Sequence, residues 1–489
     1  MQADEIVEGL KRIVGNNNIS ADPDLLKEYS GDLSFFPEKS PVCVVWPLKT
    51  SKIEAIVKFA NEKNFPLIPV SSKPGYRHHG DTIPQDDNTV ILDLSKMDKI
   101  LDINRKYRVI NIEPGVTFGE LIPELGKHGL RLIGSLLPRG NKSVLTSALE
   151  REPVLMTRHQ WDTSDPLLCT EVVFGTGDLF RTGSAAGPGT LKQQKKAGQA
   201  HVNPMGPTQF SPFRLIQGAQ GSIGVVTWAT IKCELLPTLQ KVYHLQSTNL
   251  NELLDFQHLL VKYRLCDEIF ILNDVNLACL LKQDSKEIEA FEKILGKWNL
   301  IFVASGRGPL AKDRIDYLDG DIKDLMKKSG IVEPPGEHPV KDEEILGILN
   351  ASCDKPWKLR CSGAYQDIFF ISNIQKIPEH VSLADSEASG LKLGVYIQPL
   401  NQGTSCHCEF DIYYDNTTQA VEAETVFSNL SKKLIKQGAF FNRPYGLWKK
   451  DVFEEFDESN ASLMKKIKNI FDPNGVLNPG VLCFKEGGQ

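Results

Sequence analysis

The sequence predicts an α+β protein built from two domains. The chain has 489 residues, which is more than one hydrophobic core usually organises. From residue 40 onward, short apolar strands alternate with amphipathic helices, and after Pro237 strands and helices mix in a different order. We expect a helical lead-in over residues 1–38, a first domain over 39–237, a second domain over 238–430 and a C-terminal segment over 431–489.

The first domain is expected to begin with a strand, a helix and a second strand. Val42–Trp46 is a short apolar strand, and Leu67–Val70 is the next one. Between them we expect a helix that begins near residue 50 and ends by Asn64, before a proline. Its apolar residues recur at helical spacing on one face, namely Ile53, Ile56, Val57 and Ala60.

Two further strands and a capped helix follow an unusual loop over residues 71–89. Val90–Leu94 and Val109–Ile112 are short apolar runs typical of strands. Thr117 stands three residues before Glu120, which is the spacing of a capping box. The pattern therefore predicts a helix that begins after Thr117.

A hairpin and an irregular loop come next. Leu168–Phe174 and Leu179–Thr182 flank a Gly-Thr-Gly-Asp turn, so we expect them to pair. Residues 183–212 are rich in Gly and Pro and predict a long irregular loop, which in a compact domain is usually functional.

The most informative stretch is FRLIQGAQGSIGVVTWATIKCELLP, residues 213–237. A helix-like run passes through Gly218, Gly221 and Gly224 directly into the β-branched strand Val225–Ile231. Glycine lets a backbone approach a ligand closely or take a positive φ. A simple turn needs one glycine, so three of them favour contact with a flat or phosphorylated ligand.

The second domain is expected to mix strands and helices. The expected strands are Glu268–Leu272, Leu300–Ala304, Gly394–Pro399 and Ser405–Tyr414, and the helices include Ile288–Leu295 and Ala420–Gln437. Residues 306–356 are charged and interrupted by Gly and Pro, which indicates a surface insertion. The chain closes with a helix that stops at the Asp-Pro-Asn-Gly run beginning at Asp472.

Composition excludes several classes of partner. The protein is 41% hydrophobic and 24% charged, as soluble globular proteins are, and its net charge is −6 with no long basic run. Nucleic acids and anionic membranes are therefore not expected partners. No stretch approaches the roughly 18 consecutive apolar residues of a membrane span, and the N-terminus has no apolar signal core.

Ten cysteines are scattered through the chain, mostly inside apolar runs. This pattern favours reduced, buried thiols in a cytoplasmic protein over a disulfide framework. No Cys-x-x-Cys pair occurs, so we expect no iron–sulfur cluster on this chain.

Four segments together resemble the FAD-linked oxidase family of the vanillyl-alcohol oxidase / p-cresol methylhydroxylase type. They are the loop from Leu67 to Pro84, the segment INIEPGVTFGEL, the hairpin EVVFGTGDLFRTGS with the later GAQGSIGVVTWATI, and the terminal FDPNGVLNPG. The resemblance implies FAD as cofactor and a PCMH-type FAD-binding domain, to which the C-terminal segment returns. Residues 238–430 would then form a cap domain over the flavin.

The resemblance also implies the residues that hold FAD. Glycine-rich turns offer converging backbone N–H groups to a diphosphate. The implied residues are Pro74, Gly75, Tyr76, Arg77, His78, Gly80, Pro114, Gly115, Gly140, Ser143, Gly218, Gln220, Gly221, Ser222, Gly224, Val225 and Asn478.

Two of these segments depart from the family pattern. The first loop, SSKPGYRHHGDTIP, has only two glycines where the family has a run of them. The next, LLPRGNKSVLTSALERE, has Gly140 where the family has a Gly-Gly pair, and Ser143 or Ser147 could supply hydroxyl donors. Tyr76, not a histidine, falls at the position of covalent flavin attachment, so non-covalent binding is expected. A relative without FAD stays an alternative.

Three candidates for chemistry stand out, and His79 is the first. It falls where phenol-oxidising members of the family place a tyrosine that faces the substrate. A histidine there suits a base, because its pKa lies near neutrality. The alternative is that His78 and His79 are two surface histidines of a loop.

The second candidate is His407 in the strand SCHCEFDIY. Alternation puts Cys406, Cys408, Phe410 and Ile412 on one face, which favours a core role over a Cys-His-Cys metal site. No metal ligands are therefore assigned. His407 and Glu409 share the polar face, and Tyr396 and Gln398 share a face of the preceding strand, so each pair is a candidate for the site or for structure only.

The third candidate is Arg443 in FFNRPYGLW. Phenol-oxidising relatives use an arginine here to stabilise a phenolate, although their neighbouring tyrosine is Asn442 in this chain. An arginine amid Tyr445 and Trp448 is also typical of a carboxylate or phenolate binder, because the guanidinium fork matches such anions. A surface arginine beside buried rings is the alternative.

These features predict an FAD-dependent oxidoreductase that passes a hydride from a small organic substrate to flavin N5. The substrate would be an anionic aromatic or phenolic alcohol, or a hydroxy acid, with His79 or His407 as base, Arg443 as anchor, and Tyr396 and Tyr445 in the site. The alternatives are a D-2-hydroxyacid dehydrogenase of the lactate or glycolate type and a flavin-bearing subunit of a larger redox complex. An electron-transfer partner protein and a homodimer both stay open.

Overall fold

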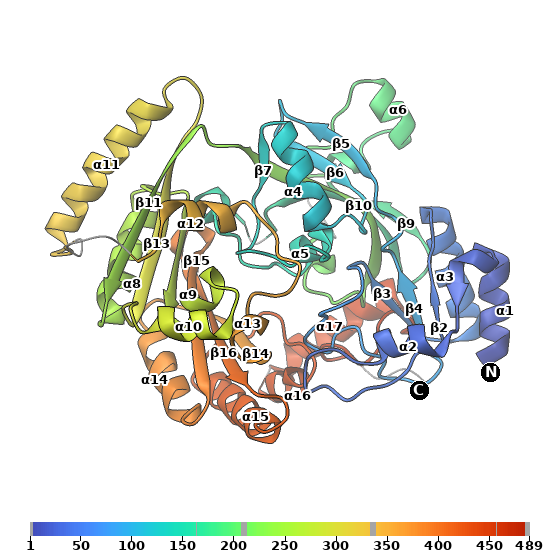
Figure 1. Cartoon of the computed structure of the whole chain (residues 1–489). Coiled ribbons are helices and arrows are strands. Elements are labelled where there is room, and N and C mark those ends of the chain that lie inside the picture. The colour runs from blue at the N-terminus through green and yellow to red at the C-terminus, as the bar shows by residue number, and fades with distance from the viewer. Residues whose placement is uncertain (1–2, 163, 207–212, 333–338, 456, 485–489) are drawn as a thin grey trace.

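The computed structural model describes residues 3–162, 164–206, 213–332, 339–455 and 457–484. Figure 1 shows two lobes, with two sheets on one side of the molecule and a third sheet on the other. The mixed helix and sheet class predicted from the sequence is confirmed. The residue boundaries proposed for the domains stay a prediction. Within those domains, residues 207–212 and 333–338 lie outside the described residues.

The first sheet has four strands in the order β1-β2-β4-β3. The strands β2, β4 and β3 are parallel, and β1 pairs antiparallel with β2. The face of α3 predicted from helical spacing is buried, and Asn64 ends this helix in the left-handed conformation (φ 54°). The elements are α1 (Ala3–Val14), β1 (Ile19–Ser20), α2 (Pro23–Ser30), β2 (Cys43–Val45), α3 (Thr50–Lys63), β3 (Leu67–Val70) and β4 (Val90–Asp93).

The second sheet is antiparallel, in the order β5-β6-β10-β8-β9. In addition, β7 pairs with the C-terminal end of β10. The predicted capping box is present, since Glu120 accepts hydrogen bonds from the backbone N–H and the hydroxyl of Thr117. The elements are β5 (Ile100–Asn104), β6 (Val109–Ile112), α4 (Phe118–Lys127), β7 (Leu130–Leu132), α5 (Val144–Leu149), β8 (Leu167–Phe174), β9 (Leu179–Arg181), α6 (Leu191–Lys196), α7 (Phe213–Ile216) and β10 (Gly224–Leu235).

The third sheet is antiparallel, in the order β11-β13-β12-β15-β16-β14. Helices pack on both of its faces, in two separate hydrophobic clusters. Its strands are β11 (Leu239–Ser247), β12 (Glu268–Asn273), β13 (Trp298–Gly306), β14 (Ala364–Ser372), β15 (Lys392–Leu400) and β16 (Ser405–Tyr414). Its helices are α8 (Leu250–Lys262), α9 (Asp274–Leu281), α10 (Ser285–Glu292), α11 (Ala311–Lys328), α12 (Asp342–Leu349), α13 (Leu359–Ser362), α14 (Ile377–Glu387) and α15 (Ala420–Lys436).

The alternation predicted for 405–412 is confirmed in β16. Cys406, Cys408, Phe410 and Ile412 lie in one hydrophobic cluster. His407 and Glu409 share the opposite face, where Nε2 of His407 is 3.2 Å from Oε2 of Glu409.

The C-terminal helix α16 (Trp448–Glu454) packs beside α15 of the third sheet, and α17 (Glu458–Phe471) lies between it and the first sheet (Figure 1). After α17, the Asp472 carboxylate accepts hydrogen bonds from the backbone N–H groups of Val476 and Leu477. The backbone N–H of Asn478 then donates to the carbonyl of Leu67 in β3 at 2.8 Å. The end of the chain is thereby fixed against the strand that leads into the 71–82 loop.

Residues 306–356 are more structured than the sequence pattern indicated. They include the 18-residue helix α11 and the helix α12, and the segment does not stay on the surface. Its end reaches the first lobe, where the backbone N–H of Gly140 donates to the carbonyl of Cys353 at 2.7 Å. The expectation of a surface insertion is wrong for this end of the segment.

All ten cysteines are free thiols, and eight of them are buried. The expectation that they form no disulfide framework is confirmed. Within the described residues, the helices are all too short or too polar to cross a bilayer. The cytoplasmic location stays a prediction.

Candidate active site

A cavity of about 310 Å³ lies where the two lobes and the C-terminal segment meet. Its walls come from the 71–82 loop after β3, the segment 135–153, the glycine cluster before β10, the residues around β14, and residues 443–478. Segments far apart in the sequence therefore enclose one space.

The 71–82 loop reaches the cavity through an irregular backbone. Tyr76 and His79 both have positive φ (55° and 79°), in the region that side chains other than glycine rarely adopt. The loop is held in place because the N–H of Gly80 donates to Oδ2 of Asp32 at 2.6 Å. A Cβ on Gly80 would stand 2.6 Å from Cβ of Phe36, so glycine is required at that position.

The glycine cluster forms the opposite wall. Gly218, Gln220 and Gly221 all have positive φ. A Cβ on Gly221 would stand 2.5 Å from Cγ of Pro69, so this loop packs against β3 too closely for any side chain. The side chain of Asn478 donates to the carbonyl of Gln220 at 2.6 Å, which joins this loop to the C-terminal segment.

Two guanidinium groups, one buried (Arg77) and one half-buried (Arg139), have buried donors without partners in the cavity wall. Arg77 lies over the ring of Tyr29, and its Nη1 donates to the carbonyl of Glu28, while its Nε and Nη2 have no partner among the described residues. Arg139 donates to the carbonyl of Gly75 at 2.7 Å, and its Nε has no such partner. Buried cationic donors without partners indicate an anionic ligand.

The predicted cofactor residues divide into two groups. Those that line the cavity are Tyr76, Arg77, His78, Gly218, Gln220, Gly221, Gly224, Val225 and Asn478. Those that do not line it are Pro74, Gly75, Gly80, Pro114, Gly115, Gly140, Ser143 and Ser222.

Ser143 and Ser222 show what the second group does. The Ser143 hydroxyl accepts from the N–H of Thr146 at the start of α5 and donates to the carbonyl of Pro114. The Ser222 hydroxyl donates to the carbonyl of Ala219. Both hydroxyls are used within the protein, so each shapes a loop of the site and leaves no donor for a ligand.

Arg443 and Tyr445 lie side by side in the cavity wall. Arg443 is 5% exposed, stands 4.2 Å above the ring centre of Phe369, and its Nε has no hydrogen-bond partner among the described residues. Tyr445 stacks on His79 with ring centres 5.2 Å apart, and its buried hydroxyl also lacks a partner in the described chain. Burial raises the pKa of Tyr445 well above its ordinary value, so the hydroxyl keeps its proton.

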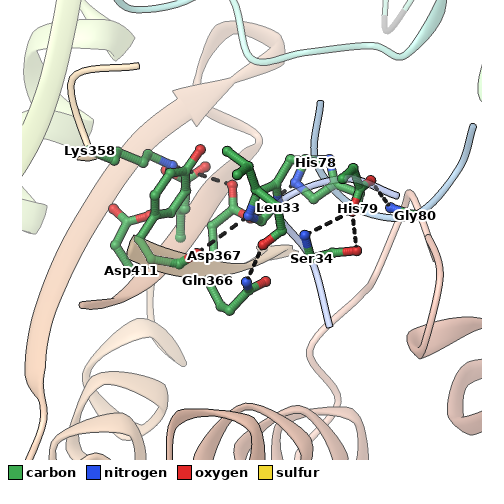
Figure 2. A network of polar contacts seen from close by, with 12 residues as sticks. Leu33, Ser34, His78, His79, Gly80, Lys358, Gln366, Asp367 and Asp411 are labelled. Carbon is green, nitrogen blue, oxygen red and sulfur yellow. Dashed lines mark hydrogen bonds and ion pairs between the residues drawn. The ribbon is translucent and has the colours of Figure 1, made fainter. Parts of the chain in front are cut away.

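The 71–82 loop meets the third sheet through two histidines (Figure 2). Nε2 of His79 is 3.0 Å and Nδ1 of His78 is 3.4 Å from the same oxygen, Oδ1 of Asp367 on β14. On its other side, Asp367 faces the ammonium group of Lys358 at 3.4 Å. Lys358 also contacts Glu409 at 2.5 Å and Asp411 at 2.9 Å.

The two histidines differ in pKa because their surroundings differ. Burial lowers the pKa of His78 to about 4, so its ring is neutral at pH 7. Burial also lowers the pKa of His79, but the charge and hydrogen bond of Asp367 outweigh this effect and the net shift is upward. In this arrangement Asp367 occupies Nε2 of His79, so this nitrogen is not free to take a proton from a substrate.

His407 and Tyr396 lie deeper in the third sheet (β11–β16), which is called the cap sheet from here on. His407 is 2% exposed and does not line the cavity, and burial lowers its pKa. Its neighbour Glu409 does line the cavity. Tyr396 also reaches the wall, and its hydroxyl donates to the side chain of Gln398, as their predicted shared face allows.

Sequence reasoning missed an ionic cluster in the wall. Lys142 pairs with Glu150 at 2.8 Å and with Glu152, and all three line the cavity. Burial opposes ionisation of Glu152, but Lys142 and Arg443 nearby hold its pKa at about 2. Burial and the charge of Glu150 raise the pKa of Asp81, another lining residue, to about 7.

Asp367 and the aromatic residues beside it were also missed. Tyr365, Asp367 and Phe369 line the cavity from one face of β14. Their alternation in AYQDIFFIS is visible in the sequence and could have placed them on one face. No pattern in the sequence indicates that this face meets a loop almost 300 residues earlier.

Comparison with known proteins agrees with this geometry. Residues 41–183 match the family described as an FAD binding domain, and residues 445–482 match the C-terminal domain of FAD linked oxidases. The chain is 22% identical to the flavoprotein subunit of 4-cresol dehydrogenase (hydroxylating) from Pseudomonas putida, over 97% of this chain and 94% of that protein. It is 23% identical to the mitochondrial D-lactate dehydrogenase (cytochrome) of Kluyveromyces lactis, over 90% of this chain and 73% of that protein.

A solved structure has the same fold. The 4-ethylphenol oxidase from Gulosibacter chungangensis, in complex with isoeugenol, superposes with a TM-score of 0.79 at 18% identity, covering 99% of this chain and 97% of that one.

The lobes, the cavity and the two matching regions define an FAD-dependent oxidoreductase. Residues 41–183 and 445–482 are similar to the two domains of FAD-linked oxidases, and the fold is that of the vanillyl-alcohol oxidase / p-cresol methylhydroxylase type. The resemblance stated from its motifs is confirmed, and the alternative of a relative without FAD is set aside.

The residues present fit this cofactor. The unpartnered nitrogens of Arg77 and Arg139 suit a diphosphate, which carries negative charge and accepts several hydrogen bonds. The tightly packed loop around Gly221 brings backbone to the cavity surface where a side chain would intrude. Leu145, Val225 and Val226 add apolar wall for flat rings.

Proposed function

We propose that the enzyme oxidises a small aromatic anion, of which a 4-alkylphenolate is the simplest example, at the carbon attached to its ring. FAD supplies the hydride-accepting chemistry, and the protein binds the substrate, orients it and excludes water. Loss of a hydride from such a phenolate leaves a neutral quinone methide, so the charges of this step balance without a further proton.

The observation that carries the proposal is the unpaired Arg443. A guanidinium group that is 5% exposed usually has a carboxylate partner, because an uncompensated buried charge is costly. No ion pair within 4.0 Å connects Arg443 to a carboxylate of the described chain, and its Nε lacks a partner. Glu152 interacts with Arg443 electrostatically but forms no ion pair with it within 4.0 Å, so an anionic substrate would supply the direct partner that Arg443 lacks.

Tyr445 supports the same interpretation. Its buried hydroxyl is a second donor without a partner, two residues from Arg443. A phenolate oxygen accepts hydrogen bonds from both a guanidinium and a hydroxyl group, and charge-assisted bonds of this kind are the strong ones. His79 holds the Tyr445 ring by stacking, so we assign His79 a positioning role instead of the role of base.

The walls around these donors favour an aromatic substrate. Trp357, Tyr365, Phe369, Tyr396 and Tyr445 all line the cavity. Aromatic rings prefer to pack on other aromatic rings, in stacked or edge-to-face geometry.

Oxidation of a D-2-hydroxy acid is the second candidate. Arg443 would bind the carboxylate equally well, and the relative from Kluyveromyces lactis is named a D-lactate dehydrogenase. That reaction also needs a base for the hydroxyl proton. Nε2 of His79 faces Asp367 and His407 does not line the cavity, so neither predicted base is placed for this step, whereas the phenolate needs none. Asp81, which lines the cavity with its pKa raised to about 7, is the residue that would have to act as base for a hydroxy acid.

Anaerobic mixing tests the proposal. The purified flavoprotein is mixed with 4-alkylphenols and, separately, with D-lactate or glycolate, and loss of flavin absorption is followed. We expect the phenols to bleach the flavin, and Arg443→Met to lower the efficiency of reduction by about 10–100-fold, the equivalent of roughly 1.5–3 kcal/mol for a charge-assisted bond.

Bleaching by hydroxy acids alone would establish the second candidate in place of the first. A flavin that no small molecule bleaches, in protein that purifies with a cytochrome or iron–sulfur partner, would instead establish an electron-transfer subunit. Equal reduction of Arg443→Met and wild type would contradict the assigned role of Arg443.

A further inference from the structure

Three ligating atoms from both lobes converge on one point of the cavity wall (Figure 2). They are Nδ1 of His78, Nε2 of His79 and Oδ1 of Asp367, all within 4.8 Å of one another. The side chains of His78 and Asp367 are each 8% exposed, and that of His79 is 25% exposed. The histidines follow β3 and the carboxylate lies on β14, so the cluster spans the contact between the lobes.

One contact of His78 favours a particular tautomer. Its Nε2 stands 3.4 Å from the backbone carbonyl oxygen of Tyr365, and in the tautomer that donates to this oxygen Nε2 carries the proton. In the neutral ring Nδ1 then carries no proton and presents its lone pair. The ring is held in this orientation because it stacks on Tyr365 with the planes 5° apart.

The bare Nδ1 of His78 faces an acceptor. It is 3.4 Å from Oδ1 of Asp367 and has no hydrogen-bond partner among the described residues. Two lone pairs that face each other in a buried site repel, and a cation between them would relieve this repulsion. Protonating both histidines would supply positive charge, but their ring centres are only 4.7 Å apart, and two buried imidazolium ions would repel each other.

The spacing of the three atoms is close to that of ligands around one metal ion, with one distance inside the expected range and one a few tenths of an ångström shorter. Ligand atoms about 2.0–2.2 Å from a tetrahedral zinc ion stand roughly 3.3–3.6 Å from one another. The two distances to Oδ1 of Asp367 are 3.4 and 3.0 Å. Two imidazole nitrogens and one carboxylate oxygen suit zinc and neighbouring first-row divalent ions.

The surroundings resemble the outer shell of such a site. The remaining N–H of His78 donates to a backbone carbonyl, which is how proteins usually orient a metal-binding histidine. Oδ2 of Asp367 faces Lys358, so Oδ1 is the oxygen left for an ion. The neighbouring group of Asp367, Glu409 and Asp411 already holds the ammonium of Lys358 at 3.4, 2.5 and 2.9 Å, which leaves no second place for a cation.

We infer that His78, His79 and Asp367 form a binding site for one divalent ion of the zinc class, which links the 71–82 loop to the cap sheet. The inference does not depend on the substrate of the enzyme. It assigns to the two adjacent histidines a function that their positions in the loop did not indicate.

Metal binding by the purified full-length flavoprotein tests this site. The protein is stripped with a chelator, dialysed against Zn²⁺ and analysed for zinc by mass spectrometry, and affinity is measured by calorimetry. We expect one zinc ion per chain, and a rise in Tm on adding zinc, because the ion joins two segments in the folded state only.

The variants His78→Phe and Asp367→Asn identify the site. Phenylalanine keeps the stacking on Tyr365 and asparagine keeps the shape of the carboxylate, so an unchanged circular dichroism spectrum shows that each variant folds. We expect each to weaken zinc binding at least 100-fold and to abolish the zinc-dependent rise in Tm. His128→Gln is the matched control, since that histidine lies near Glu124 with its side chain 44% exposed, and we expect it to keep one zinc ion.

Wild-type protein that binds no zinc would overturn the inference and leave a protonated His78 to explain the contact. Zinc bound equally well by the two variants would overturn it also. Neither result bears on whether the enzyme oxidises phenols.

Discussion

At the scale of single residues, Arg443 and Tyr445 both present buried polar atoms that the protein itself does not satisfy. A folded protein usually pairs such atoms, and the exceptions concentrate where a ligand completes them. The same holds for Arg77 and Arg139 at the other wall. These four residues therefore mark the places in the cavity where the anionic groups of ligands are expected to bind.

The variant Tyr445→Phe distinguishes a role of the Tyr445 hydroxyl in substrate binding from a role in the stability of the fold. Removing a buried hydroxyl without a partner relieves an unfavourable desolvation of about 1–3 kcal/mol, so we expect Tm to stay constant or to rise. The stacking on His79 is kept. The efficiency of flavin reduction by a phenol should fall, by about tenfold for one lost hydrogen bond of roughly 1.4 kcal/mol. A fall in Tm together with unchanged kinetics would show that the hydroxyl has a structural partner instead.

Glu152 gives a pH dependence with a definite sign. Lys142 and Arg443 hold its pKa at about 2, below the ordinary value of 4.5. A depressed folded-state pKa stabilises the protein above the unfolded pKa, and this contribution is lost as the pH falls from 4.5 toward 2. The full contribution is on the order of 3 kcal/mol.

Glu152→Gln should therefore destabilise the protein at pH 7, as measured by unfolding in denaturant. The difference from wild type should shrink at pH 4 and below, where the wild-type carboxylate begins to lose this advantage. A difference that stays constant from pH 7 to pH 4 and below would show that its charge is not what stabilises the fold.

At the scale of elements, the cavity is shaped mainly by loops, and the strands hold these loops in place. The 71–82 loop and the loop before β10 both use positive φ and close packing to bring backbone to the cavity. The strands β3 and β10 then hold these loops at fixed positions relative to each other and to the C-terminal segment.

Gly221→Ala tests this requirement. A Cβ at this position would stand 2.5 Å from Cγ of Pro69, and φ is 69°, so we expect weaker FAD binding and lower stability, by about 1–3 kcal/mol. Gly320→Ala on the helix α11 is the control, because its Cβ meets nothing within 4 Å, and it should stabilise the protein by roughly 0.5–1 kcal/mol. FAD content and Tm of both variants are the measurements. A Gly221 variant with normal FAD content would contradict the account of this loop.

Local patterns predicted the helices and strands well where the apolar residues followed a single helical or strand periodicity. The helix α3, the capping box at Thr117, the hairpin of β8 and β9 and the two faces of β16 were all visible in the sequence. The helix α11 was missed because its charged sequence was interpreted as an insertion.

The site was predictable only in part. Arg443, Tyr445 and the glycine cluster carry their own signals in the sequence. The contact of His79 with Asp367 joins residues 288 positions apart, and no local pattern encodes such a distance. The hydroxyls of Ser143 and Ser222 were expected to serve a ligand because spacing alone cannot show that they satisfy neighbouring carbonyls.

At the scale of the whole molecule, the cavity exists because two lobes and the chain end meet there. Buried ion pairs connect the lobes, with Arg131 on Glu268 at 2.5 Å and Arg158 on Asp267 at 2.7 Å. The cap sheet contributes Asp367, Phe369 and Tyr396, while the first lobe contributes the glycine loops. Neither lobe alone would enclose a substrate beside the cofactor.

The absorption spectrum of the purified full-length protein, recorded as an aromatic anion such as benzoate is added, tests this account most directly. We expect one FAD per chain, released into the supernatant by acid. We also expect benzoate to shift the flavin spectrum of the wild type but not that of Arg443→Met. A colourless protein that takes up no FAD, or an equal shift in the variant, would contradict it.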